Sequence, residues 1–328
     1  SVYGTTPSVN AGTITGFVNS QNQASATTGT LTFTTAATSA SGVGSYAING
    51  SGLTANNGNY TFTQAAGNST ALTITPATLT ITANNQSTTY GTALSLGTSA
   101  FTTGGLVNGD TVTATALKFS NSATVLATQN AGTYSNSNGI IASAASGTGL
   151  GNYSIVYTPG TLTVDKATLT VTADAKSMVY GANALPTLTA TITGFANSQT
   201  LATSGVTGSA ALSTTATAYN GTAGSASPVG TYTTTPTLGT LAAANYLFTY
   251  APGVFTVTPA TLTITANNDS KVYGASTTTA GLNYSAGVAV ANIAYTASGL
   301  VNGDTISSVN FSAPTGGITS ANVGSYTV

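Results

Sequence analysis

The sequence predicts an all-β protein built from tandem repeats, and three observations support this prediction. Motifs that contain tyrosine recur at intervals of roughly 90 residues along the 328-residue chain. Apolar residues alternate with threonine in short runs, which is the period-2 pattern of half-buried strands. Gly, Ser, Asn and Pro separate these runs, as expected of turns, and no stretch has helical periodicity. We therefore expect an array of small β-modules.

Three tyrosine motifs define the module, and they keep the same order along the chain. A Tyr-Gly step comes first, and the steps are 87, 90 and 93 residues apart: Tyr3-Gly4, Tyr90-Gly91, Tyr180-Gly181 and Tyr273-Gly274. A Gly-Ser/Thr-Tyr step follows and ends at Tyr46, Tyr134, Tyr232 and Tyr326. An Asn-Tyr step comes next, at Asn59-Tyr60, Asn152-Tyr153 and Asn245-Tyr246. The ordered recurrence indicates one structural unit repeated in tandem.

Each module closes with a strand, and the next module opens with another strand without a linker. Leu72 and Ile74 close the first module, whereas Leu79 and Ile81 open the second with the opposite parity. Because a shift of one residue turns every side chain to the other face of a strand, the buried face must change near Pro76. Lys166 and Pro259 mark the same change of parity further on. The apolar residues that we expect to be buried in the following module are Leu79, Ile81, Leu169, Val171, Leu262 and Ile264.

These junctions divide the chain into four modules: residues 1–75, 76–165, 166–258 and 259–328. Modules 1 and 4 are incomplete at the N-terminal and C-terminal side, because they lack the opening strand and the Asn-Tyr and closing strands respectively. We expect the natural chain to continue in both directions, or a neighbouring copy to donate the missing strands. An immunoglobulin-like β-sandwich fits the module length, so the array would form an elongated, semi-rigid rod. β-Grasp-like modules and a solenoid stalk are the alternatives.

Two kinds of module alternate. Residues 16–21 and 194–199 read Gly-Phe-Val/Ala-Asn-Ser-Gln, whereas residues 106–110 and 300–304 read Leu-Val-Asn-Gly-Asp. Asn-Gly favours a tight turn because both residues tolerate positive φ, and an Asp after it ordinarily caps that turn. We therefore expect a turn-capping role for Asp110 and Asp304, and an array that repeats in pairs.

Composition excludes several classes of function. The chain has no Cys, His or Trp, and its four cations are all Lys and its five anions all Asp. Catalysis generally needs a positioned proton carrier, nucleophile or metal, and nucleic-acid binding needs a basic surface. No apolar run approaches the roughly 20 residues of a membrane-spanning helix. We therefore expect no enzyme activity, no catalytic, cofactor-binding or metal-binding residue, no cofactor, no nucleic-acid partner and no membrane span in this segment.

The ordered motifs resemble a known family. The Ala-Thr-Leu-Thr-Ile/Val opening, the Tyr-Gly step, the Gly-Leu-Val-Asn-Gly-Asp turn and the Asn-Tyr close are similar to MBG-type modules, which are mostly β and rich in glycine. Such modules occur in tandem in large exported bacterial proteins of the filamentous-haemagglutinin-like kind. The resemblance implies an extracellular location at the bacterial cell surface, in an adhesin or a fibre. The absence of Cys agrees with export of a long chain.

The expected function is a structural repeat region that acts as a spacer or as a filament-building unit. Its partners would then be further copies along a fibre, or the continuation of a longer chain. The alternative is an adhesion module that binds glycans or host surfaces, for which Tyr219, Tyr284 and Tyr295 are the candidates because they lie outside the repeated motifs. We expect Tyr46, Tyr134 and Tyr232 to lie at equivalent, mostly buried places, with their hydroxyl groups bonded to backbone.

Overall fold

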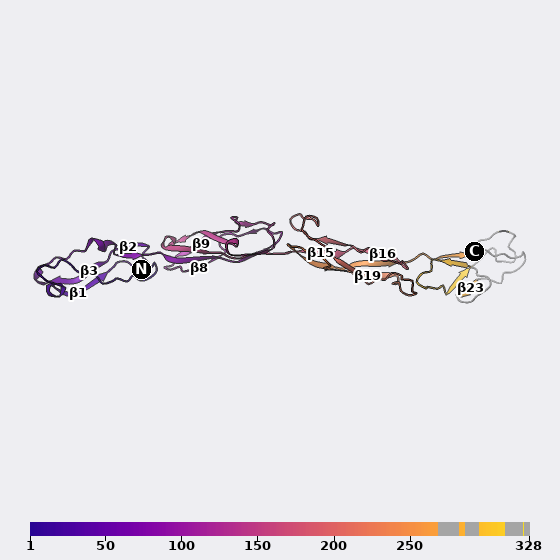
Figure 1. Cartoon of the computed structure of the whole chain (residues 1–328), viewed down its shortest axis with the longest axis horizontal. Coiled ribbons are helices and arrows are strands. Elements are labelled where there is room, and N and C mark those ends of the chain that lie inside the picture. Colours follow the sequence, from indigo (N-terminus) through magenta and orange to yellow (C-terminus); the bar gives the residue numbers. More distant parts are fainter. Residues whose placement is uncertain (268–281, 286–294, 312–323, 325–328) are drawn as a thin grey trace. The chain divides into compact units, whose positions relative to one another are not determined.

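The protein is known from a computed structural model, which describes residues 1–267, 282–285, 295–311 and 324. The chain divides into two compact units, Ser1–Ala167 and Thr168–Val328, and each contains two modules (Figure 1). Strands dominate both units, and the described residues contain a single α-helix, α1 (Gln23–Ala26). The expectation of an all-β repeat array is confirmed.

The first unit contains fourteen strands and four short 3₁₀ helices. The strands are β1 (Thr27–Thr34), β2 (Gly44–Tyr46), β3 (Asn49–Ala55), β4 (Leu72–Ile74), β5 (Ala77–Ala83), β6 (Gln86–Thr89), β7 (Leu94–Ser95), β8 (Phe101–Gly104), β9 (Thr111–Lys118), β10 (Thr124–Val125), β11 (Gly132–Tyr134), β12 (Ile141–Thr148), β13 (Tyr153–Thr158) and β14 (Leu162–Asp165). The 3₁₀ helices are η1 (Asn56–Gly58), η2 (Ala66–Thr70), η3 (Asn136–Asn138) and η4 (Leu150–Asn152).

The described part of the second unit contains strands of the same kinds. They are β15 (Ala167–Ala173), β16 (Lys176–Val179), β17 (Ala190–Thr193), β18 (Ala211–Thr214), β19 (Gly230–Thr237), β20 (Tyr246–Ala251), β21 (Gly253–Thr258), β22 (Thr263–Ala266), β23 (Leu282–Ser285), β24 (Tyr295–Ser298) and β25 (Ser308–Phe311). Tyr90 of the second Tyr-Gly step lies among the described residues. Tyr273 of the fourth Tyr-Gly step and Tyr326 of the fourth Gly-Ser/Thr-Tyr step lie outside them.

Module 2 is organised by two parallel strand pairs. β13 pairs with β5, and the continuation of both segments places β14 beside β6. Antiparallel neighbours complete two three-stranded sheets, in the orders β13-β5-β8 and β11-β14-β6. Immunoglobulin-like sandwiches are antiparallel, so the strand pairing inside this module differs from that topology. Module 3 repeats the parallel arrangement, with β21 beside β16 in the sheet β16-β21-β19-β18.

A glycine marks the point where each long pair passes from one sheet to the other. A Cβ atom on Gly160 would stand 2.5 Å from the carbonyl oxygen of Ala83, and one on Gly253 would stand 2.2 Å from that of Ala173. Side-chain carbon atoms do not approach a backbone oxygen so closely. The Pro-Gly step of the repeat therefore allows two backbones to cross in contact.

The predicted change of buried face is confirmed where modules 2 and 3 open. Leu79, Ile81, Leu169 and Val171 are all completely buried, and the closing residues Leu72 and Ile74 before Pro76 are buried as well.

The same prediction is wrong for Leu262 and Ile264, which are 44% and 43% exposed. β5 and β15 each have a neighbour on both sides, whereas β22 pairs with β24 alone among the described residues. A strand with one free edge buries less of its side chains, because no second neighbour covers them.

Module 1 differs from modules 2 and 3 in the segment after its Asn-Tyr step. The equivalent segments form β13 and β20, which lie beside the opening strands β5 and β15 of their modules. In module 1, residues 59–65 form no strand. The N-terminal segment instead pairs with the end of module 1, through a parallel β-bridge between Val2 and Thr75.

Candidate functional site

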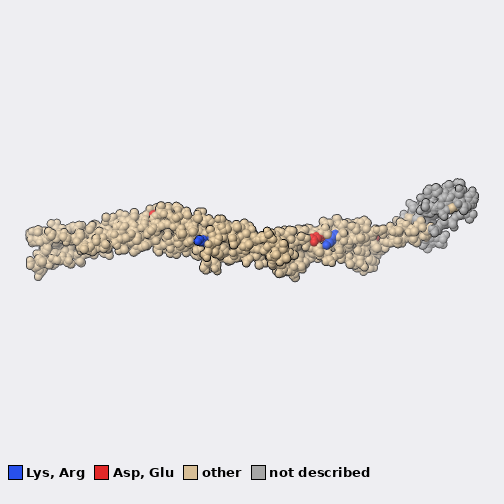
Figure 2. All heavy atoms as spheres, turned by 90° about the horizontal axis from the view of Figure 1, so that it is seen from above, with Lys and Arg blue, Asp and Glu red and all other residues tan. Residues whose placement is uncertain are grey.

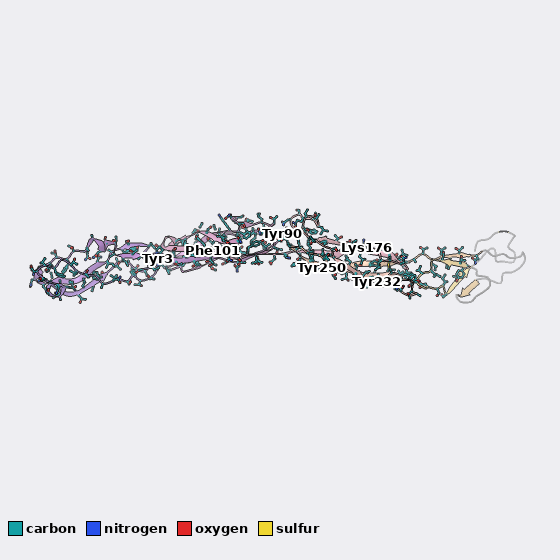
Figure 3. The ribbon with its side chains drawn as sticks, viewed as in Figure 1. Tyr3, Tyr90, Phe101, Lys176, Tyr232 and Tyr250 are labelled. Carbon is teal, nitrogen blue, oxygen red and sulfur yellow. The ribbon has the colours of Figure 1, made fainter. Side chains whose placement is uncertain are left out.

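The most elaborate cluster of polar side chains in unit 1 lies where module 1 meets module 2. Tyr3 belongs to the Tyr-Gly step of module 1 (Figure 3). Asp110 ends the Asn-Gly-Asp turn between β8 and β9, and Tyr153 begins β13. The hydroxyl groups of Tyr3 and Tyr153 both donate to Oδ2 of Asp110, each at 2.9 Å. We call these three residues the tyrosine–aspartate cluster.

The tyrosine–aspartate cluster is shielded from solvent. Tyr3 is 5% exposed and Tyr153 8% exposed, and their rings meet edge to face with centroids 5.5 Å apart. The backbone N–H of Val107 donates to the Tyr153 hydroxyl at 2.9 Å. Hydrogen bonds to a charged group in a poorly solvated place are stronger than those between neutral groups. The cluster therefore links two modules through a partly buried, directional contact.

The environment of Tyr153 changes its acidity. Burial raises the pKa of Tyr153 above the ordinary 10.0, although the hydrogen bond with Val107 opposes this in part. The hydrogen bond to Asp110 and the negative charge of that carboxylate raise the pKa further. Ionisation of this hydroxyl would place a second negative charge beside the first, so the cluster favours the neutral phenol.

Backbone contacts surround the tyrosine–aspartate cluster. Gly4 N–H donates to the carbonyl oxygen of Ser39 at 3.2 Å, and the Asn108 side-chain amide donates to the same oxygen at 2.9 Å. A Cβ atom on Gly4 would stand 2.5 Å from Cγ2 of Val107, and its φ is +86°. Any larger residue would push the next module away, so the glycine of the Tyr-Gly step is needed for the two modules to meet.

Unit 2 contains a related junction, between modules 3 and 4. Asn302 donates from its side-chain amide to the Tyr180 hydroxyl at 2.8 Å, and its Oδ1 accepts the N–H of Ala226 at 3.0 Å. A Cβ atom on Gly181 would stand 2.3 Å from Cγ2 of Val301, as at Gly4 and Val107. The same steric match therefore recurs at both junctions between an Asn-Ser-Gln module and an Asn-Gly-Asp module.

The Asn-Tyr tyrosines explain why Asp alternates with Gln in the turn motif. Tyr60 donates to Oε1 of Gln21, and Tyr246 donates to Oε1 of Gln199, both at 2.5 Å. Tyr153 donates to Asp110, at the same position of the motif. Both side chains are hydrogen-bond acceptors, and this shared property is the signal in the sequence that would have identified Asp110 as more than a turn cap.

The aromatic partner of the Asn-Tyr tyrosine also alternates. Phe17 meets Tyr60 edge to face at 5.7 Å between ring centroids, and Phe195 meets Tyr246 at 6.1 Å. Module 2 has Leu106 at the position of the phenylalanine. Tyr3 of the preceding module supplies the missing ring there, with the same edge-to-face geometry. An interaction made within modules 1 and 3 is thus made between modules at this junction.

The tyrosines of the Gly-Ser/Thr-Tyr step occupy equivalent places, as expected. Tyr46, Tyr134 and Tyr232 pair with Leu72, Leu162 and Phe255 of the closing strands (Tyr232 is labelled in Figure 3). Each hydroxyl donates to the backbone carbonyl four residues earlier, at 2.7, 2.8 and 2.7 Å. The expected burial was too strong, because all three side chains are half-buried. Their hydroxyl groups reach the backbone at the module surface and remain partly open to solvent.

Charged side chains are sparse in the described residues, and Figure 2 shows only a few on the visible face, where one acidic and one basic patch lie next to each other. Asp174 accepts from the hydroxyl groups of Thr189 and Thr191 at 2.6 and 2.7 Å, and these bonds lower its pKa. Within the described part of the chain, no three His, Cys, Asp or Glu residues come together as metal ligands would. The same part contains no helix of the length and hydropathy needed to cross a membrane.

The fold and its junctions define a tandem array of all-β modules that carry tyrosine anchors. The family model of the MBG domain (YGX type) matches residues 1–70, 79–163, 169–256 and 262–328. The chain therefore belongs to the MBG domain family, and the Tyr-Gly step in each module accords with that description. No curated protein and no solved structure matches the chain.

Proposed function

We propose that the chain is a non-catalytic, structural repeat region of an extracellular bacterial surface fibre or adhesin stalk, in which it serves as a semi-rigid spacer or filament-building unit. Membership of the MBG family and four tandem modules support a structural repeat region of a surface protein. The absence of His, Cys and Glu supports the non-catalytic part of the proposal.

The junction between modules 1 and 2 is the observation that carries the proposal. Only two residues, Thr75 and Pro76, separate the last strand of module 1 (β4) from β5, and Thr75 forms a β-bridge with Val2. Tyr3, Asp110 and Tyr153 then connect the modules through partly buried hydrogen bonds. A junction without a flexible linker and with partly buried polar contacts resists bending, which is the property a spacer needs.

Spin-label distance measurements on the full chain test this proposal. The native chain has no Cys, so Thr54→Cys in module 1 and Ser154→Cys in module 2 provide two unique labels. We expect a narrow distance distribution, and a broader one when Gly4→Ala forces Val107 away. Gly67→Ala is the matched control, because a Cβ atom there meets nothing within 4 Å. Equally broad distributions in the parent and Gly4→Ala would count against a semi-rigid spacer.

Glycan binding was the alternative from sequence, and the tyrosine contacts give it no support. The hydroxyl groups of Tyr46, Tyr134 and Tyr232 already donate to backbone. Tyr219 and Tyr295 are half-buried, and the side chain of Tyr284 lies outside the described residues. The spacer proposal therefore stands as the principal one.

A further inference from the structure

The first and last strands of module 2 are the ones through which the neighbouring modules would pull on it. β5 follows the junction with module 1, and β14 precedes the junction with module 3. Tension along the chain therefore enters module 2 at Ala77 and leaves it at Asp165. The resistance of this module to stretching depends on what holds its opening segment, residues 77–89, to its closing segment, residues 153–165.

The opening and closing segments run in parallel with one constant register. Partners are always 76 residues apart, as 77 and 153 are at one end and 89 and 165 at the other. Six residue pairs join β5 to β13, and four join β6 to β14. The two strand pairs thus form one long ladder that changes sheet near its middle.

Tension loads this ladder in shear. Because the two segments run in the same direction, the end of the opening segment that is pulled and the end of the closing segment that is pulled lie at opposite ends of the ladder. The segments are therefore drawn past each other along their axes, and all the hydrogen bonds between them share the load. In an antiparallel pair of terminal strands the pulled ends would lie together, and the bonds would break one after another.

Hydrogen bonds between the segments continue through the crossing point and past the last strand pair. Gln86 N–H donates to the carbonyl oxygen of Thr161 at 2.9 Å, and Thr161 N–H donates to Oδ1 of Asn85 at 2.7 Å. Beyond β6, Tyr90 N–H donates to the carbonyl oxygen of Asp165 at 2.8 Å. The Asn85 side chain therefore supplies an acceptor where the change of sheet interrupts the backbone ladder.

Buried side chains shield the ladder from water and fix its register. Leu79, Ile81 and Leu162 are fully buried, and Val164 is 3% exposed. A hydrogen bond in such surroundings is electrostatically stronger than one in solvent. A slip by one residue would turn these apolar side chains to the outer face, so the segments cannot creep past each other in single steps.

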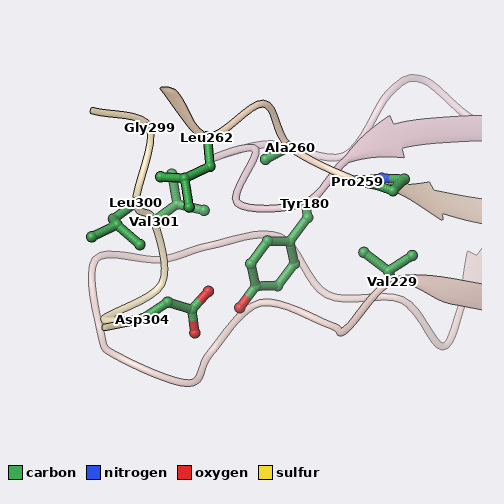
Figure 4. Close-up of a pocket in the computed structure, with 9 residues that line it drawn as sticks. All are labelled: Tyr180, Val229, Pro259, Ala260, Leu262, Gly299, Leu300, Val301 and Asp304. Atoms are coloured by element: carbon green, nitrogen blue, oxygen red, sulfur yellow. The ribbon is translucent and has the colours of Figure 1, made fainter. Parts of the chain in front are cut away.

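Module 3 repeats the arrangement. β16 lies parallel to β21, and β15 lies beside β20. At the end of the first pair, Tyr180 N–H donates to the carbonyl oxygen of Thr258 at 2.8 Å, as Tyr90 donates to Asp165 in module 2. Figure 4 shows this end, where Tyr180 and Pro259 line the same pocket. Pro259 follows β21 directly, so tension also leaves module 3 beside the last hydrogen bond between its two segments.

We propose that the parallel opening and closing segments of modules 2 and 3 form a mechanical clamp, which keeps each module folded while the chain is under tension. Forced unfolding is governed by the rate of unfolding, and a step that must break many bonds together is slow. This function goes beyond that of a semi-rigid spacer, because it concerns stretching within a module rather than bending at a junction. Either property can therefore be absent without the other.

Single-molecule stretching of the full chain in two directions tests the clamp. The chain has no Cys, so paired substitutions provide unique thiol attachment points, and only the residues between them are stretched. Thr78→Cys with Asp165→Cys, at two exposed positions, loads the ladder of module 2 in shear. Thr78→Cys with Gly151→Cys pulls the neighbouring starts of the two segments apart, so that the ladder unzips. A Cβ atom on Gly151 meets nothing within 4 Å.

We expect module 2 to survive at least about tenfold longer in shear than in unzipping at the same force, since a tenfold change in rate corresponds to roughly one hydrogen bond in the barrier. Equal lifetimes in the two directions, or a shorter lifetime in shear, would overturn the proposal.

A side-chain variant tests the crossing point of the clamp. Asn85→Ala removes the acceptor of the Thr161 N–H and should shorten the lifetime in shear by about threefold or more. It should leave the lifetime in unzipping nearly unchanged, because the first bonds to break lie at the other end of β5. Asn138→Ala is the matched control, since Asn138 is exposed and lies in the same module outside both segments. An equal loss in both pulling directions would mean that Asn85 affects stability in general, and would contradict its place in the clamp.

Discussion

At the scale of single residues, tyrosine hydroxyl groups determine how the modules are joined. The same Asn-Tyr tyrosine finds a Gln acceptor in modules 1 and 3 and an Asp acceptor in module 2. Only at the Asp does a second tyrosine, Tyr3 of the preceding module, share the acceptor. A carboxylate oxygen has lone pairs for both donors, and its charge strengthens both hydrogen bonds.

The raised pKa of Tyr153 predicts a loss of stability in alkali. The folded state holds the phenol proton more tightly than the unfolded chain, whose tyrosine has a pKa of about 10. The stabilisation is therefore complete below about pH 10 and is lost as the pH rises through the raised pKa of Tyr153. Urea denaturation should show a free energy of unfolding that is level at neutral pH and falls as the pH rises above about 10.

Tyr153→Phe is the comparison for this experiment. It should lower the free energy of unfolding at neutral pH by about 1.5–3 kcal/mol, since Asp110 and Val107 N–H both lose a partner. Its stability should then fall less steeply in alkali than that of the parent. Tyr250→Phe is the control, because the Tyr250 side chain is 38% exposed. Parallel pH profiles for the parent and Tyr153→Phe would contradict the assigned effect.

At the scale of elements, each complete module depends on two long segments that run in parallel and cross between sheets together. β5 continues into β6 and β13 into β14, so one pair of segments contributes to both three-stranded sheets. Parallel strands need a long connection, and here most of the module is that connection. The two segments can cross only where no side chain separates their backbones. The crossing therefore requires glycine at positions 160 and 253.

Substitution of the crossing glycine should be costly. In Gly160→Ala the new methyl group would stand 2.5 and 2.7 Å from the carbonyl oxygens of Ala83 and Asn84. Overpacking of this kind lowers stability by about 1–3 kcal/mol. Gly151→Ala is the matched control, since its Cβ atom meets nothing within 4 Å and should change the free energy of unfolding by less than about 0.5 kcal/mol. Urea denaturation of the full chain compares the two, and similar midpoints would show that the crossing tolerates a side chain.

At the scale of the whole molecule, cohesion comes mainly from apolar packing and from hydrogen bonds between uncharged groups. The chain has four lysines and five aspartates in 328 residues, and its net charge is −1. Modules 2 and 3 instead bury alternating apolar side chains of their opening and closing strands. Folding of such a chain owes little to interactions between distant charges, and its surface offers little electrostatic repulsion between copies.

The stability of the chain should therefore depend weakly on salt. Raising NaCl from about 0.05 M to about 0.5 M shortens the range of electrostatic interactions severalfold, but few charges are present to respond. We expect the urea midpoint of the full chain at neutral pH to stay nearly constant. A large, monotonic shift of the midpoint would mean that the few charged groups contribute more than their sparse distribution indicates.

The sequence by itself determined the all-β class, the four tandem modules and most of the buried strand positions. These features follow from local information, because the period-2 alternation, together with the point at which its phase changes, indicates which face of each strand is apolar. The equivalence of Tyr46, Tyr134 and Tyr232 also followed from their recurrence at one place in the module. Burial of Leu262 and Ile264 did not follow, because burial requires a neighbouring strand as well as an apolar pattern.

Only the tertiary structure decided the pairing of strands and the identity of the junction residues. Tyr3 lies 107 residues from Asp110 in the sequence, and Asn302 lies 122 residues from Tyr180. The Asn-Gly-Asp motif describes only the local turn, and from it we predicted that Asp110 caps that turn. The motif contains no information about which distant hydroxyl groups donate to the carboxylate. Parallel pairing of β5 with β13 is likewise a contact between segments far apart in the chain. Such contacts are set by packing between segments that are distant in the sequence, which local patterns do not encode.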